Sequence, residues 1–183
     1  MIYLVTGVMR SGTSAMMEAL EAGGLPVVKS DERRRLNERF GAMTDYRPNP
    51  IDLYEPAASD FHERHFPCRF DGMAIKVVAP LITHLAVHQY RALVMRRSPA
   101  EIQVSYLRAF KRHLALEWIE DIQQDAYTVL LNRRDVVDIR ECPYEDLVND
   151  PTRIFQGLHT AGWPIDPVRA ALAIRHDERR IYV

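Results

Sequence analysis

Lysine is scarce in this chain of 183 residues, and long apolar runs are missing from it. Of its 24 basic residues only three are lysines, Lys29, Lys76 and Lys111, and the remaining 21 are arginines. Arginine favours bidentate contacts with phosphate and sulfate, so this composition suits anion binding. No apolar run approaches the roughly 20 residues that cross a bilayer, and the first apolar run lacks the basic segment and cleavage site of a signal peptide. We therefore expect no membrane partner.

Cysteine is scarce as well, and the net charge of the chain is close to zero. Cys68 and Cys142 are the two cysteines, and their separation matches no metal or redox motif. We expect both to be reduced thiols in a cytoplasmic protein. A net charge of −1 argues against a general nucleic-acid binder. The length suits a single domain over residues 1–183, large enough to bury a core.

Short apolar runs alternate with amphipathic or charged segments along the chain. The expected strands are 2–6, 25–28, 73–78, 92–95 and 136–139. The expected helices are 13–22, 30–40, 81–89, 99–113, 115–132, 151–160 and 167–174. This alternation predicts an α/β fold, a three-layer α/β/α domain with a central parallel sheet that binds ligands at the carboxyl ends of its strands. The irregular segment 41–56 indicates a functional loop or lid within the region 30–70.

The turn between the first strand and the first helix has the layout of a phosphate-binding loop. Gly7 and Gly12 are separated by four residues, the glycine spacing of a Walker A motif, but Thr13 stands where that motif has lysine. The cation inside the loop is Arg10. Further anion donors are the hydroxyl and backbone N–H groups of Ser11, Gly12, Thr13 and Ser14. The loop is therefore predicted to bind phosphate, without the usual triphosphate chemistry.

A second candidate anion site follows the strand expected at 92–95. Arg97 comes at the end of this strand, and Ser98 and Pro99 are suited to begin a helix as its N-cap and first residue. Ser105 lies about two turns into that helix. An arginine at a strand end and a serine eight residues later could hold one further phosphate together.

The two sites together resemble the sulfotransferases that use 3′-phosphoadenosine 5′-phosphosulfate (PAPS). Their 5′-phosphosulfate loop reads Lys/Arg-Ser-Gly-Thr-Thr/Ser, as residues 10–14 do here. Their 3′-phosphate site pairs an arginine at a strand end with a serine eight residues later, as Arg97 and Ser105 do. A third similarity is the segment Tyr-Glu-Asp-Leu at 144–147, followed by Asp-Pro at 150–151. The resemblance covers most of the chain and implies a sulfotransferase topology related to that of the P-loop NTPases.

The resemblance implies transfer of a sulfuryl group from PAPS to a hydroxyl or amine of a small-molecule or carbohydrate acceptor, leaving adenosine 3′,5′-bisphosphate (PAP). It implies no metal. Arg10 and the loop amides would stabilise the transferring group and the departing phosphate. Lys76 aligns with a lysine that contacts the sulfuryl group in the cytosolic members, and the region 30–70 would shape the acceptor pocket.

The general base is a point of departure from the family. Cytosolic members carry Lys-Thr-His-x-Pro, but this chain has Val78 in place of the histidine. Glu55 is our first candidate, because residues 49–55 look like the Asn-Pro-x-Gly-Tyr/Phe-x-Glu segment of some bacterial and carbohydrate-directed members, where a glutamate is the base. Asp52 replaces the glycine of that segment. The rival candidates are His62, His65 and His84.

The contacts to the nucleotide also depart from the family pattern. Ala15 replaces the tryptophan that stacks on adenine in cytosolic members, and the sequence lacks their C-terminal Arg-Lys-Gly-x-x-Gly segment, which clamps the 3′-phosphate. Arg175, Arg179 or Arg180 could substitute for it. Two other functions therefore stay open: a P-loop nucleotide or small-molecule kinase that lacks the standard lysine, and a non-catalytic nucleotide-binding module.

Overall fold

The computed structural model describes residues 1–32, 34–35, 38, 52–63, 66 and 68–174. Its centre is a sheet of four strands in the order β2-β1-β3-β4, in which every neighbouring pair is parallel. The strands are β1 (Ile2–Gly7), β2 (Ala74–Val78), β3 (Tyr90–Arg96) and β4 (Val136–Pro143). The predicted α/β fold with a central parallel sheet is confirmed.

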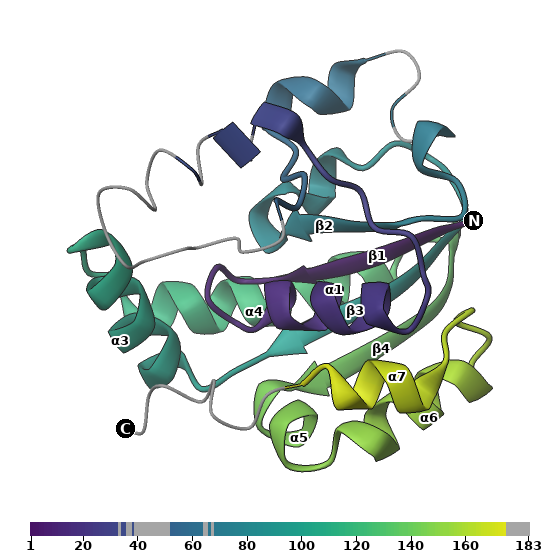
Figure 1. Ribbon diagram of the computed structural model, residues 1–183. Coiled ribbons are helices and arrows are strands. Elements are labelled where there is room, and N and C mark those ends of the chain that lie inside the picture. Colours follow the sequence, from purple (N-terminus) through teal and green to yellow (C-terminus); the bar gives the residue numbers. More distant parts are fainter. Residues whose placement is uncertain (33, 36–37, 39–51, 64–65, 67, 175–183) are drawn as a thin grey trace.

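Helices cover both faces of the sheet, which makes three layers (Figure 1). One face, with Tyr3 and Val5, packs against α1 (Thr13–Ala22), α5 (Tyr144–Asn149), α6 (Pro151–Thr160) and α7 (Pro167–Leu172). The other face, with Ile2 and Leu4, packs against α4 (Leu116–Leu131) and the 3₁₀ helices η1 (Ala58–His62), η2 (Cys68–Phe70) and η3 (Ala79–His84). Successive β1 side chains alternate between the two cores, as the period of a strand requires.

The helix α3 (Pro99–Phe110) lies past the carboxyl ends of the strands (Figure 1). Its Ile102 packs with Val8 of the loop after β1 and with Ile119 of α4. None of the helices in the described part of the chain combines the length and the apolarity needed to cross a bilayer.

The carboxyl end of β1 is the point where the strand order reverses. From β1 the chain goes to β2 on one side of it and then to β3 on the other. Gly7, the last residue of β1, is in register with Val78 of β2 and with Met95 of β3. Parallel sheets bind ligands in the crevice at such a switch point. The loop that begins at Gly7 and the turn that follows β3 therefore meet at the same edge.

Several expected boundaries were wrong. Residues 25–28 form no strand but an isolated bridge from Val27 to Ala74, next to Pro26, which has no N–H to donate. The helix expected at 81–89 is the 3₁₀ helix η3, which begins earlier and ends earlier. The predicted helix 99–113 ends at Phe110, where Lys111 adopts a left-handed conformation.

The chain after Val136 was also only partly predicted. The strand expected at 136–139 continues to Pro143. Its second half was not predicted, because the charged side chains of this edge strand hide its apolar alternation. The short helix α5 was missed, and so were η1 and η2. In the helix expected at 30–40, residues 31–32, 34–35 and 38 are helical, whereas 33, 36–37 and 39–40 lie outside the described residues. Residues 41–51 of the expected loop also lie outside them.

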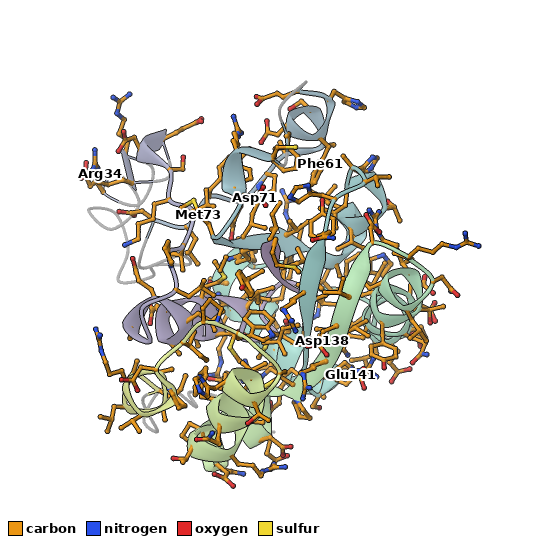
Figure 2. All side chains as sticks on the ribbon, turned by 90° about the vertical axis from the view of Figure 1, so that its right-hand side faces the viewer. Arg34, Phe61, Asp71, Met73, Asp138 and Glu141 are labelled. Atoms are coloured by element: carbon orange, nitrogen blue, oxygen red, sulfur yellow. The ribbon has the colours of Figure 1, made fainter. Side chains whose placement is uncertain are left out.

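Figure 2 views the molecule from the end where the strands begin. Phe61 lies on η1 and packs edge-on against Phe66. Asp138 and Glu141 lie on β4, the edge strand of the sheet opposite β2. Asp71 lies at this end and accepts hydrogen bonds from the Met1 amine and His88. This charged end is opposite to the switch point, so the two polar regions are separate.

We predict that the two cysteines differ in reactivity. Cys142 is buried in β4, and burial raises its pKa to about 12, whereas Cys68 is exposed on η2. Because the thiolate is the reactive form, an aromatic disulfide reagent at about pH 8 should modify one thiol in the folded protein and two after denaturation. The Cys68→Ser variant should show no fast reaction. Rapid modification of that variant in the folded state would contradict the buried position of Cys142.

Candidate functional site

The loop from β1 to α1 depends on an unusual backbone. Arg10 adopts φ 75° and Gly12 adopts φ 99°, both in the left-handed region that most residues avoid. A Cβ atom at Gly12 would lie 2.3 Å from Cδ2 of Tyr144. Gly12 is therefore required twice, by its backbone conformation and by the ring of Tyr144 that packs against it. A non-glycine residue held at positive φ, as Arg10 is, is typical of a functional loop.

The loop presents several hydrogen-bond donors at the N-terminus of α1. Gly12, Thr13 and Ser14 contribute backbone N–H groups of the first turn, which a helix leaves without intrahelical acceptors. The hydroxyl group of Ser11 is fully buried and has no hydrogen-bond partner among the described residues. An unsatisfied buried hydroxyl costs roughly 1–3 kcal/mol. An oxyanion seated on this helix end fits all of these groups.

The two predicted anion sites are in direct contact. Nε of Arg10 donates a hydrogen bond to Oγ of Ser105 over 3.0 Å, and Nη1 of Arg97 donates to the backbone carbonyl of Arg10 over 3.2 Å. Ser105 is buried on α3. Arg97 and Ser105 thus face the same loop, but they meet through Arg10 rather than with each other.

Arg97 is held from three sides. Its Nε donates to Oε2 of Glu101 over 2.8 Å, and its guanidinium carbon lies 4.4 Å from the ring centroid of Tyr144. The side chain is only 8% exposed. These contacts, with the one to Arg10, use two of the five guanidinium N–H groups, so that three remain without a described acceptor. Three donors in one plane are suited to a phosphate.

Lys76 is one of the buried charged side chains of the described residues. It lies inside β2, is 5% exposed and faces α1, where its Nζ donates to Oγ of Ser14 over 3.0 Å. The same ammonium forms an ion pair with the carboxylate of Glu55, which is 26% exposed. A buried lysine requires such a partner. The predicted base and the predicted sulfuryl-binding lysine are therefore in contact, next to the loop.

The segment that carries Glu55 is fixed to the rest of the fold by its backbone. The amide of Ser30 donates to the carbonyl of Asp52 and that of Tyr54 donates to the carbonyl of Val28, both over 2.9 Å. The hydroxyl of Tyr54 donates to Asp60 over 2.5 Å. These bonds place Glu55 beside β2.

Asp52 adopts φ 57°, which explains a departure noted in the sequence. The family segment has glycine at this position, and the chain has aspartate in the left-handed conformation that glycine favours. Aspartate and asparagine tolerate this conformation better than other residues. The substitution therefore preserves the backbone path toward Glu55.

The other candidate residues lie elsewhere or outside the described residues. His62 and His84 are exposed on η1 and η3, and no described contact joins either of them to Lys76 or Arg10. His65 lies outside the described residues. So do Arg175, Arg179 and Arg180.

Some site residues were not recognised in the sequence. Glu101 follows Arg97 by four positions, and this spacing of opposite charges at a helix start was the available signal. Tyr144 was noted only as part of a motif, although its ring separates Gly12 from Arg97. Contacts between such distant positions leave no pattern in a single sequence.

A hollow beside the loop is bordered by α1 and α5. Its lining residues are Ala15, Glu18, Tyr144, Leu147, Val148, Ala173 and Ile174. Glu18 and Tyr144 are the lining residues with polar side-chain groups, and the other five are apolar. The hollow lies where the small Ala15 side chain leaves room next to the loop.

We predict that Gly12→Ala destabilises the protein more than Gly24→Ala does. Both glycines adopt a similar positive φ, 99° and 94°, but a Cβ at Gly24 would meet nothing within 4 Å. Gly24→Ala should therefore cost about 1–2 kcal/mol of backbone strain, and Gly12→Ala a further 1–3 kcal/mol or so from overpacking against Tyr144. Urea unfolding measures both free energies. Equal losses would show that Tyr144 does not pack against the loop.

Known proteins resemble this chain in structure but not in sequence. No protein-family model and no curated protein matches the sequence. The sulfotransferase domain of the olefin synthase from Synechococcus PCC 7002 is 15% identical, with a TM-score of 0.52 over 93% of this chain and 75% of that one.

Retinol dehydratase, solved with androsterone and the inactive cofactor PAP, is 12% identical, with a TM-score of 0.50 over 96% of this chain. This chain spans 63% of that protein's length. At such identities the likeness concerns the fold alone. The chain has the fold of the sulfotransferases, and the contact between its two predicted anion sites lies at the switch point of its own sheet.

Proposed function

We propose that this chain is a sulfotransferase that moves a sulfuryl group from PAPS to a hydroxyl or amine of a small-molecule or carbohydrate acceptor. The observation that carries the proposal is the contact of Arg97 with the carbonyl of Arg10, while Arg10 binds Ser105. A single nucleotide with phosphates at both its 3′ and 5′ positions can bridge these adjacent groups.

The described donors suit the parts of such a nucleotide. Arg97, with three N–H groups that no described acceptor binds, would bind the 3′-phosphate. The helix N-terminus with the hydroxyls of Ser11 and Ser14 would bind the phosphosulfate.

The chemistry needs charge stabilisation and a proton acceptor. The donor supplies an activated sulfuryl group. Arg10 and Lys76 would stabilise the negative charge that develops on this group and on the departing phosphate. Glu55, paired with the Lys76 ammonium, would accept the proton of the acceptor hydroxyl or amine. Lys76 would thus bridge the base and the loop.

The position of Lys76 favours sulfuryl transfer over triphosphate chemistry. In a Walker A enzyme the hydroxyl that follows the lysine position binds magnesium. Here that hydroxyl belongs to Ser14, and it accepts a hydrogen bond from the Lys76 ammonium. A fixed cation therefore already stands where a kinase would place its metal ion.

We predict that Arg97→Ala weakens the binding of PAP and spares adenosine 5′-monophosphate (AMP), because Arg97 would contact only the 3′-phosphate. Loss of a charge-assisted phosphate contact is worth roughly 1.5–3 kcal/mol, or about one to two decades in affinity. Calorimetric titration with each nucleotide measures the effect.

The matched control is Arg134→Ala, which removes the same charge from an exposed turn at the opposite end of β4. It should leave both affinities unchanged. Equal losses for PAP and AMP in Arg97→Ala would contradict the assignment of the 3′-phosphate site, and a wild-type protein that does not prefer PAP would refute the proposed function.

We predict that Glu55→Gln lowers sulfuryl transfer by about 10²- to 10⁴-fold, the range for loss of a general base, with PAP affinity changed little. Transfer of labelled sulfate from PAPS to pooled hydroxyl and amine acceptors measures the rate. Glu63→Gln is the control, since Glu63 is an exposed neighbour paired with Arg69. Unchanged transfer in Glu55→Gln would exclude this base. Binding without any transfer by the wild type would favour a binding module, and magnesium-dependent ATP turnover would favour a kinase.

A further inference from the structure

A buried glutamine on α4 holds the turn that carries Arg97. Six polar or charged residues are buried in the described chain, and Gln123 is one of them, at 5% exposure. Its side-chain oxygen Oε1 accepts a hydrogen bond from the backbone amide of Arg97 over 3.0 Å. Its own backbone carbonyl accepts one from Nη1 of Arg96, also over 3.0 Å. One residue of α4 therefore binds both arginines at the end of β3.

The turn has little else to fix its backbone. Arg97 lies between the last residue of β3 and the N-cap of α3, so its amide has no place in the sheet ladder or in the helix. The N-cap residue, Ser98, makes no side-chain capping hydrogen bond. Gln123 therefore supplies the acceptor that this part-buried amide needs, since an unpaired one would be costly.

The backbone of Arg97 sets the direction of its guanidinium group. That group must reach Glu101, Tyr144 and the carbonyl of Arg10 at once, and its remaining N–H groups take their orientation from these contacts. Binding groups need to be held within about 0.5 Å of their productive positions by neighbouring residues. A shift of the amide of Arg97 would move the donors that face the ligand.

We propose that Gln123 is a positioning residue for Arg97, and that it determines how strongly the site prefers a nucleotide with a 3′-phosphate. The inference rests on the proposed function, because the preference exists only if Arg97 binds that phosphate. A merely structural role, in which Gln123 anchors α4 to the sheet, predicts a loss of stability but no change in this preference.

The test compares the affinities for PAP and AMP in the full chain. Gln123→Met keeps the length of the side chain and removes the acceptor. Its ratio of PAP to AMP affinity should fall by about tenfold, the effect of misplacing a binding group without removing it, while its AMP affinity stays within about twofold of the wild type. The matched control is Gln124→Met, since Gln124 is the exposed neighbour on the same helix. This control should keep the wild-type ratio.

A second variant covers the case in which Gln123→Met does not fold. Gln123→Asn keeps the amide but shortens the side chain by one methylene group, which takes the oxygen out of reach of the Arg97 amide. It should lower the same ratio. Urea unfolding of each variant separates stability from preference.

The outcomes distinguish this inference from the proposed function. A folded Gln123 variant with the wild-type ratio, or with equal losses for both nucleotides, overturns the positioning role. If Arg97→Ala then still abolishes the preference, the proposed function stands without it. If the wild type itself does not prefer PAP, both fail together.

Discussion

The hydrogen bond from Arg97 to the backbone carbonyl of Arg10 is the interaction on which the candidate site depends. It joins two segments that are 87 residues apart in sequence. It is possible because β1 and β3 are neighbours in register, so that Gly7 lies opposite Met95 and the loop after one strand faces the turn after the other. Without this pairing, the helix N-terminus and the second arginine would be two unrelated surface features.

The same bond requires the unusual backbone of the loop. The carbonyl of Arg10 can accept from Arg97 while the Arg10 side chain binds Ser105, because this residue adopts a positive φ. The strain, of order 1–3 kcal/mol, is offset by bonds to α3 and to the turn after β3. Gly12 completes the arrangement, since Tyr144 occupies the space that any side chain there would need. The loop is thus shaped by its neighbours as much as by its own residues.

The sequence predicted those parts of the molecule that depend on local patterns. The bounds of α1 follow from the glycines on either side of its apolar face, and the nearness of the two anion sites follows from the rule that parallel strands end at one edge. The burial of Lys76 could not be predicted in this way, because it depends on which face of β2 meets α1 and on the partner, Glu55, from another segment. The left-handed Asp52 was visible only as a mismatch to a motif, and the role of Gln123 left no local signal at all.

The charges of the site are arranged in advance of any ligand. Arg10, Arg97 and Lys76 bring three positive charges to one strand edge, which would repel each other in a poorly solvated crevice. Glu101 pairs with Arg97 and Glu55 pairs with Lys76, so each carboxylate balances one cation. These pairs orient the arginine and the lysine at the cost of removing ions from water, which is tolerable only where every ion is bonded. A polyanionic nucleotide would therefore meet donors that are already oriented, so little reorganisation would be needed when it binds.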